Sequence, residues 1–122
     1  MSQILVVSTD GDGLNAMLNV LGSAGYCATG AASFEDARAK LADSSPDLVI
    51  ADERLGVFNG LHVIMTARAE HPGVSAIVTT HVKNRALEAD ARSLNVRCMV
   101  KPRNAAEWLA PVSRLLTVAR VA

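Results

Sequence analysis

Five short apolar runs, separated by longer segments of helical periodicity, constrain the fold of this chain more than any other feature of its sequence. Continuous apolar runs of this length, without the alternation of a half-exposed strand, are typical of parallel strands that are buried on both faces. Apolar residues at i, i+3, i+4 and i+7 in the intervening segments give each helix one stripe to lay on a sheet. The runs cover residues 4–7, 26–29, 48–51, 76–80 and 96–100.

This alternation predicts an α/β domain in which helices cover both faces of a parallel sheet. With 122 residues, half of them apolar, the chain has the length of one domain and can bury a core without disulfides or metals. No repeat, low-complexity tract or linker interrupts the pattern. We therefore expect a single domain over residues 1–122 that contains five βα units.

Charge and hydropathy argue against several classes of partner. The formal net charge is zero, and the lysines and arginines are spread along the chain, without the basic cluster expected of a nucleic-acid-binding protein. The N-terminal segment has no basic region, and its apolar run is far too short for a signal peptide or a membrane span. We expect a cytoplasmic protein that binds neither nucleic acid nor membrane directly.

Two charged residues stand where apolar runs end. Asp52 follows the run 48–51, and a carboxylate at the end of a buried strand is costly unless it faces water or a cation. Lys101 follows the run 96–100 and precedes Pro102, which restricts the lysine to extended backbone and so fixes where its amine points. Both are candidate site residues. The competing interpretations are an aspartate that only solvates a strand end and an exposed lysine without a partner.

The segment 46–61, PDLVIADERLGVFNGL, together with the triplet Val100-Lys101-Pro102, resembles the receiver domain of bacterial response regulators, and chemotaxis regulators in particular. The resemblance extends over residues 4–116. It implies a flavodoxin-like, doubly wound five-stranded parallel sheet with strand order 2-1-3-4-5 and five helices. It also implies a role in two-component or phosphorelay signal transduction.

The resemblance assigns roles to individual residues. It implies that Asp52 accepts a phosphoryl group from a sensor histidine kinase or a phosphotransfer protein, and that Lys101 contacts this group. Thr80, at the end of the fourth run, falls at the position of the family's switch hydroxyl, although a β-branched residue is also ordinary in a strand. With the implied strand order, these three residues and Asp10 gather around one cleft at the carboxyl ends of the strands.

The expected metal site lacks its usual carboxylates. Receivers carry two adjacent acidic residues after the first strand, which help to hold Mg²⁺, but here these positions are Ser8 and Thr9. Mg²⁺ is usually bound by one or two carboxylates together with waters and phosphate oxygens. Asp52 and Asp10 are the remaining candidate metal ligands, so we expect a weak Mg²⁺ site. For Asp10, a helix cap is the competing interpretation.

Two further positions depart from the family's pattern. The aromatic switch residue, three positions before Lys101, is replaced by Cys98, which is too small to gate a conformational change. The residue after Thr80 is usually small, so that the phosphodonor can enter. Here it is His81, and we expect its ring to obstruct that entry.

These features favour a signalling receiver rather than an enzyme, with no catalysis beyond phosphoryl transfer to and from its own aspartate. Its signal is expected to leave through the fourth helix, fifth strand and fifth helix, over residues 83–94, 96–100 and 104–118. Expected partners are a sensor histidine kinase or phosphotransfer protein, a downstream protein or effector domain, and a second copy of the chain.

Two alternatives remain open at this point. One is a pseudo-receiver, which is a binding module of the same fold that works without phosphorylation. The other is a flavodoxin-like cofactor-binding protein, because the loop of residues 8–13 opens a helix and could hold an FMN phosphate. The two aspartates of that loop repel phosphate, and only four aromatic residues are present to stack on a flavin.

Overall fold

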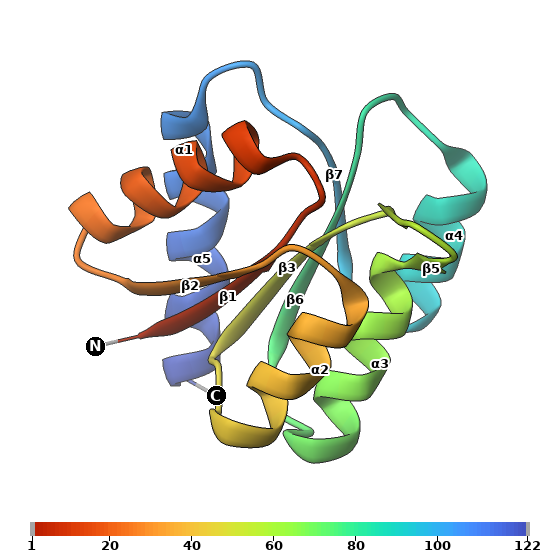
Figure 1. Cartoon of the computed structure of the whole chain (residues 1–122), viewed down its shortest axis with the longest axis horizontal. Coiled ribbons are helices and arrows are strands. Elements are labelled where there is room, and N and C mark those ends of the chain that lie inside the picture. Colours follow the sequence, from red (N-terminus) through yellow and green to blue (C-terminus); the bar gives the residue numbers. More distant parts are fainter. Residues whose placement is uncertain (1, 122) are drawn as a thin grey trace.

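A five-stranded parallel sheet forms the centre of the computed structural model, which describes the backbone of residues 2–121 and the side chains of residues 2–117 (Figure 1). The strand order is β2-β1-β3-β6-β7, while β4 and β5 form a separate two-stranded hairpin. The order is therefore the predicted 2-1-3-4-5 arrangement, which is confirmed. The strands are β1 (Gln3–Val7), β2 (Cys27–Ala31), β3 (Leu48–Asp52), β4 (Arg54–Leu55), β5 (Phe58–Asn59), β6 (Ser75–Thr80) and β7 (Arg97–Val100).

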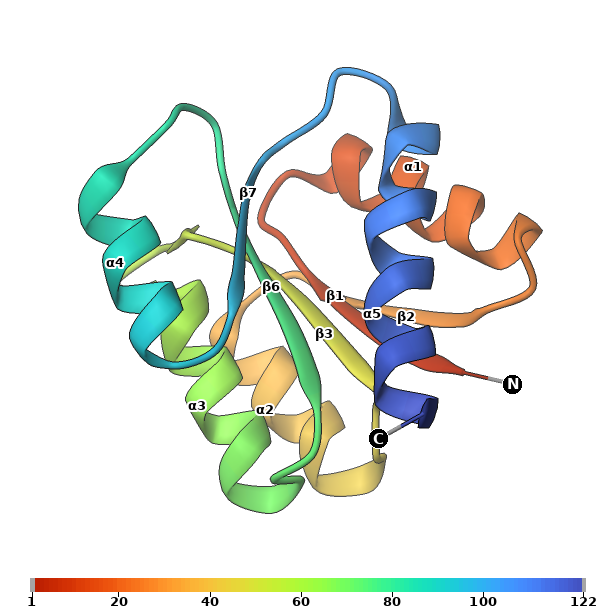
Figure 2. The same cartoon turned by 180° about the vertical axis from the view of Figure 1, so that it is seen from behind.

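Helices cover both faces of the sheet, as predicted. Two of them, α1 and α5, lie on one side, and α2, α3 and α4 lie on the other (Figure 1 and Figure 2). No helix among the described residues is long and apolar enough to cross a membrane. The helices are α1 (Gly11–Ser23), α2 (Phe34–Asp43), α3 (Gly60–Glu70), α4 (Arg85–Ser93), the short 3₁₀ helix η1 (Ala105–Trp108) and α5 (Leu109–Val121).

Two predicted ranges extend past what the structure describes. Residues 1 and 122 of the predicted domain lie outside the described residues. The predicted signalling face ends at Val118, whose side chain also lies outside them.

The sheet divides the core into two layers. Leu5 and Val7 of β1 pack in the cluster beneath α2, α3 and α4, whereas Ile4 and Val6 pack with α1 and α5. Successive side chains of a strand point to opposite faces, so a continuous apolar run fills both layers. The inner strands β1, β3 and β6 meet this requirement, whereas the edge strands β2 and β7 are partly exposed, so the expected burial on both faces holds for the inner three strands only.

Several helices begin at the carboxyl edge of the sheet, where their caps fix the connecting loops. In each case the side chain before the helix accepts a hydrogen bond from a backbone N–H of the first turn, which has no partner within the helix. These caps are Asp10 for α1, Ser33 for α2, Asn59 for α3 and Asn84 for α4.

The chain folds tightly just after Asp52. The β4–β5 hairpin turns at Gly56, whose φ of +68° favours glycine. The ring of Phe58 stacks on Phe34 of α2, with 4.1 Å between centroids, and anchors the hairpin. At Gly60, a Cβ atom would lie 2.4 Å from the backbone oxygen of Asp52, so only glycine lets α3 begin this close. The carboxylate of Asp52 is therefore presented from a constrained backbone.

Candidate functional site

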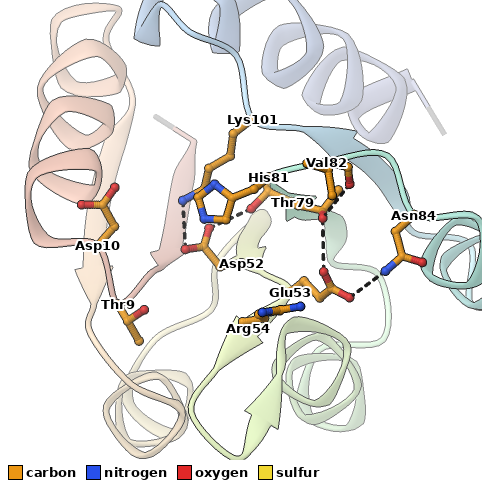
Figure 3. Close-up of a pocket in the computed structure, with 11 residues that line it drawn as sticks. Thr9, Asp10, Asp52, Glu53, Arg54, Thr79, His81, Val82, Asn84 and Lys101 are labelled. Atoms are coloured by element: carbon orange, nitrogen blue, oxygen red, sulfur yellow. Dashed lines mark hydrogen bonds and ion pairs between the residues drawn. The ribbon is translucent and has the colours of Figure 1, made fainter.

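A pocket of about 320 Å³ opens at the carboxyl ends of β3, β6 and β7, where the strand order predicted a cleft (Figure 3). The structure brings the four predicted residues Asp10, Asp52, Thr80 and Lys101 to its walls. Its other lining residues are Thr9, Glu53, Arg54, Thr79, His81, Val82 and Asn84.

The carboxylate of Asp52 is bound by one ammonium and two hydroxyl groups. Lys101 Nζ lies 3.0 Å from Asp52 Oδ2, so the two candidate charged residues form an ion pair and Lys101 is not a lysine without a partner. Ser8 Oγ donates to the same oxygen at 2.6 Å, and Thr79 Oγ1 donates to Oδ1 at 2.7 Å. Charge-assisted bonds of this kind are stronger than neutral ones. Lys101 therefore neutralises the resting carboxylate, and the hydroxyl groups of Ser8 and Thr79 hydrogen-bond its two oxygens.

Lys101 is positioned by the backbone on both sides of it. Its N–H donates to the carbonyl of Thr80 at 2.9 Å, which continues the β6–β7 ladder past the last residue of β7. Pro102 keeps the lysine backbone extended. As a result its side chain reaches from the edge strand to Asp52, with 23% of the lysine side chain and 15% of the aspartate side chain exposed.

The hydroxyl that faces Asp52 belongs to Thr79, one residue before the position predicted from the sequence. Asp52 is the register partner of Thr79, so their side chains lie on the same side of neighbouring strands. The hydroxyl of Thr80 lies 2.9 Å from the carbonyl of Val82 and 3.2 Å from Glu53 Oε1. Because adjacent strand residues point to opposite faces, only one of the two threonines can reach the carboxylate. We therefore reassign this contact to Thr79.

The reassignment also changes the interpretation of His81. The residue directly after the threonine that contacts Asp52 is Thr80, and His81 is the second. The His81 side chain is exposed and lines the pocket. Its expected obstruction of the entrance stays a prediction.

Glu53 connects the loop after Asp52 to α4, and no motif in the sequence indicated this role. Its carboxylate accepts from Asn84 Nδ2 at 3.1 Å (Figure 3). It also accepts from the Thr80 hydroxyl at 3.2 Å. The Asn84 side chain uses its oxygen to cap α4, accepting from Leu87 N at 3.1 Å. One asparagine thus joins the residue beside Asp52 to the start of α4. The spacing between Asn84 and Leu87 could have identified the cap, but not its contact with Glu53.

Ser8 occupies the place of a metal-binding carboxylate with a group that donates a hydrogen bond. Its hydroxyl accepts from Asp10 N at 3.1 Å while donating to Asp52. Asp10 itself caps α1, with Oδ1 accepting from Gly13 N at 3.2 Å, so the competing interpretation as a helix cap describes its observed contact. Thr9 is exposed at the pocket wall.

The residues present do not fit the Mg²⁺ ion that the family implies. Mg²⁺ requires a near-octahedral set of oxygen ligands that includes carboxylates. Within the described part of the chain, no three His, Cys, Asp or Glu side chains are placed to hold a metal. Asp52 is already bound by Lys101 and Ser8, and the Asp10 carboxylate is turned to α1. Metal binding by Asp52 and Asp10 stays an untested prediction.

Cys98 lies half-buried in β7, where the family's pattern has an aromatic residue. Burial raises the pKa of its thiol, and the carboxylates of Glu88 and Glu53 raise that pKa further. A raised pKa keeps the thiol protonated near neutral pH, which makes it a poor nucleophile. Cys98 is therefore a small packing residue rather than a reactive group.

Comparison with known families agrees with this geometry. A family model described as the response regulator receiver domain matches residues 4–112. The chain belongs to this family. Receiver domains are signalling modules of two-component systems rather than classical enzymes. A search of curated proteins gave no match.

Solved structures show how widely this receiver fold is shared. A CheY-like receiver domain protein from Methanospirillum hungatei is 21% identical with a TM-score of 0.90, covering 98% of this chain and 97% of that one. NtrX from Brucella abortus, in complex with ATP, is 22% identical with a TM-score of 0.89. The alignment covers 98% of this receiver but only 28% of the NtrX chain. At these identities the likeness shows the fold alone.

A third structure is somewhat more similar in sequence. The response regulator protein TrrA from Thermotoga maritima, in complex with Mg²⁺ and BeF, is 27% identical with a TM-score of 0.82. The alignment covers 94% of this receiver and 99% of TrrA. That protein was therefore crystallised with the metal that the donor set around Asp52 does not fit here.

Proposed function

We propose that this receiver accepts a phosphoryl group on Asp52 from a histidine kinase or a phosphotransfer protein. The observation that carries the proposal is the Asp52 carboxylate at the pocket wall, held by Lys101 and by hydroxyl donors on both of its oxygens. Donors fixed in advance around a carboxylate stabilise charge that develops on transferred oxygens without reorganising. The pocket beside Asp52 is the proposed route of the donor phosphate, which has to pass the exposed His81 at its wall.

The transfer itself requires little covalent chemistry from the protein. One Asp52 oxygen attacks phosphorus, the new O–P bond forms, and the bond from phosphorus to the donor nitrogen breaks, leaving the electron pair on that nitrogen. The ammonium of Lys101 and the hydroxyl of Thr79 are close enough to donate to the phosphoryl oxygens afterwards. Loss of the phosphoryl group to water would be the receiver's only other reaction.

A pseudo-receiver that binds its partner without phosphorylation is the second candidate function. It is favoured by Ser8, which supplies a hydrogen bond where the family's pattern has a metal-binding carboxylate. Asp52 is then paired and hydrogen-bonded without a divalent metal ion, and the positive charge that usually assists phosphoryl transfer is reduced to one ammonium.

We also propose an output surface, a class of partner and a location for this receiver. Output is proposed through α4, β7 and α5, and the partners through this surface are a downstream protein or effector domain. The proposal takes the chain as one domain over residues 1–122 in the cytoplasm, with no direct nucleic-acid or membrane partner. The contact from Glu53 through Asn84 to α4 supports coupling between the phosphoacceptor and this surface.

Labelling of Asp52 tests the function directly. Incubation with a small acyl-phosphate donor is expected to add one phosphoryl group to the wild type, and none to Asp52→Asn, as read by intact mass. Asparagine keeps the size of the side chain but removes the nucleophilic charge. The absence of labelling in the wild type under all donor and metal conditions would leave the pseudo-receiver as the better description.

A matched pair of substitutions tests the reassigned hydroxyl. Thr79→Val is expected to slow labelling of Asp52 about tenfold, because it removes a hydrogen bond to a charged group without changing the shape of the side chain. Thr80→Val, the same change one residue later, is expected to leave the labelling rate nearly unchanged. A slow Thr80→Val with a normal Thr79→Val would restore the assignment made from the sequence.

A further inference from the structure

The pocket beside Asp52 has little positive charge for a phosphoryl transfer. Lys101 contacts the carboxylate directly, and its charge already neutralises that of Asp52. A transferred phosphoryl group spreads further negative charge over its oxygens, and positioned cations stabilise this charge. Because Ser8 stands where a metal-binding carboxylate is expected, a second cation for the proposed transfer has to come from the protein.

Arg54 brings a second permanent cation to the wall of this pocket. It lines the pocket together with Asp52 and Lys101, and its side chain is exposed (Figure 3). Among the described residues that line the pocket, it is the one arginine. Neither of the two ion pairs found within residues 2–117 includes it. Its guanidinium is therefore available to an anionic ligand.

The backbone holds Arg54 close to the phosphoacceptor. Only Glu53 separates the two residues, so the Cα atoms of Asp52 and Arg54 are at most about 7 Å apart. The Glu53 N–H donates to the carbonyl of Thr79 at 2.7 Å, and its carbonyl accepts from Gly60 N at 3.0 Å. Arg54 itself begins β4, which is paired with β5. Its long side chain extends from a fixed base within reach of a phosphoryl group on Asp52.

The other two carboxylates of the pocket are engaged elsewhere. Glu53 accepts hydrogen bonds from Asn84 and Thr80, and the carboxylate of Asp10 caps α1. Neither carboxylate forms an ion pair with Arg54. The guanidinium is thus not neutralised by a direct carboxylate partner before a phosphodonor arrives.

The less occupied oxygen of Asp52 faces the same pocket as Arg54. Oδ2 accepts from both Lys101 and Ser8, whereas within the described residues Oδ1 accepts from Thr79 alone. Thr79 lines the pocket with Arg54, while Ser8 lines a separate hollow of about 230 Å³ between α1 and η1. Oδ1 is therefore the oxygen with lone-pair capacity left on the side of the guanidinium.

We propose that Arg54 is a further catalytic residue, whose guanidinium binds the phosphoryl group in place of a divalent metal ion. The inference rests on the proposed function, since it concerns the same transfer. Asp52 Oδ1 attacks phosphorus, the bond from phosphorus to the leaving group of the donor breaks, and the electron pair stays on that group. Arg54 donates to the phosphoryl oxygens from β4, and Lys101 donates to them from the end of β7. A planar guanidinium suits bidentate contact with phosphate oxygens.

Labelling of Asp52 in the presence of EDTA tests the proposal, with an acyl-phosphate donor at about pH 8 and intact mass as the measurement. Arg54→Met is expected to slow labelling about 10²-fold. Arg54→Lys should slow it about tenfold, because it keeps the charge but loses the bidentate geometry. The matched control is Arg103→Met, which changes an exposed arginine of the hollow between α1 and η1 and should leave the rate unchanged. His81→Gln should not slow labelling, because imidazoles carry little charge at this pH.

Two further measurements separate phosphoryl contact from a structural effect. With Ser8 and Thr9 both replaced by aspartate and Mg²⁺ present, Arg54→Met should slow labelling less than about threefold, because the metal then supplies the charge. The second measurement needs no transfer. Inorganic phosphate added to Asp52→Asn should shift amides near Arg54 and Lys101, and adding Arg54→Met should weaken this binding about fivefold.

Four outcomes would overturn the inference alone. They are wild-type labelling that requires Mg²⁺, undiminished metal-free labelling of Arg54→Met, equal slowing by Arg103→Met, and phosphate binding that does not depend on Arg54. An equally large effect of Arg54→Met in the metal-binding background would also overturn it, because the arginine would then not replace the metal. Absence of wild-type labelling under every condition would overturn it together with the proposed function, so the two failures are distinguishable.

Discussion

Replacing Ser8 and Thr9 by aspartate is expected to make phosphoryl transfer to Asp52 about 10³-fold faster when Mg²⁺ is present. In the wild type, Asp52 and Lys101 nearly neutralise each other, and the Ser8 hydroxyl lies 2.6 Å from Asp52 Oδ2. A carboxylate in that position would stand beside Asp52 and give the pocket a net negative charge. Such a pocket recruits a divalent cation, and the cation offsets the charge of the incoming phosphoryl oxygens.

The same double substitution is expected to carry a cost when the metal is absent. Three neighbouring carboxylates share one ammonium, so their repulsion should lower the free energy of unfolding by about 2 kcal/mol. Added Mg²⁺ should restore stability by binding the folded state alone. Urea unfolding with and without Mg²⁺ measures this effect, and a time course of intact mass with an acyl-phosphate donor measures the transfer rate.

The control for both measurements is Asp52→Asn in the same background, which should take no label. The wild type should react slowly and with little dependence on Mg²⁺. Fast, metal-dependent labelling of the wild type would contradict this expectation and show that Asp10 supplies the missing ligand, removing the pseudo-receiver alternative. If neither protein is labelled, the pseudo-receiver becomes the leading function.

Lys101→Met is expected to slow labelling of Asp52 about 10³-fold, because it removes the only ammonium in contact with the carboxylate among the described residues. Methionine retains much of the apolar stem and loses the charge. Only 15% of the Asp52 side chain is exposed, so the substitution also leaves a largely buried anion with two hydroxyl donors. We expect a loss of about 2 kcal/mol in the free energy of unfolding.

Lys83→Met provides the matched control for this change. Lys83 is exposed on the loop between β6 and α4, and neither of the ion pairs found among residues 2–117 involves it. Its replacement should alter neither the labelling rate nor the stability appreciably. A Lys101→Met protein that is labelled at the wild-type rate would show that the ion pair has no part in transfer.

The fold was predictable because its signals are local and repeated. Continuous apolar runs identify the strands, of which β1, β3 and β6 are buried on both faces, and helical periodicity identifies the layers that cover them. The resemblance to receivers then gave the strand order that the structure confirms. Asp52 and Lys101 could be found in the same way, since each is a charged residue at the end of an apolar run.

The hydroxyl partner of Asp52 depended on strand register. Thr79 and Thr80 are identical in type and adjacent in sequence, and their opposite orientations follow only from how β6 pairs with β3. Ser8 shows a related limit. The position of Ser8 in the sequence indicated the loss of a metal ligand. Its hydrogen bond to Asp52 could not be predicted, because the two residues are 44 positions apart in the chain and come within 2.6 Å only when β1 pairs with β3.

The order of residues was enough to predict the α/β layers, the strands and the two charged residues Asp52 and Lys101, because periodicity and strand ends are properties of neighbouring residues. Only the folded arrangement showed that Thr79 faces Asp52 and that Glu53 and Asn84 join the site to α4. These contacts join residues on different elements. Their distances depend on sheet register and helix packing, which the order of residues along a single strand or helix does not encode.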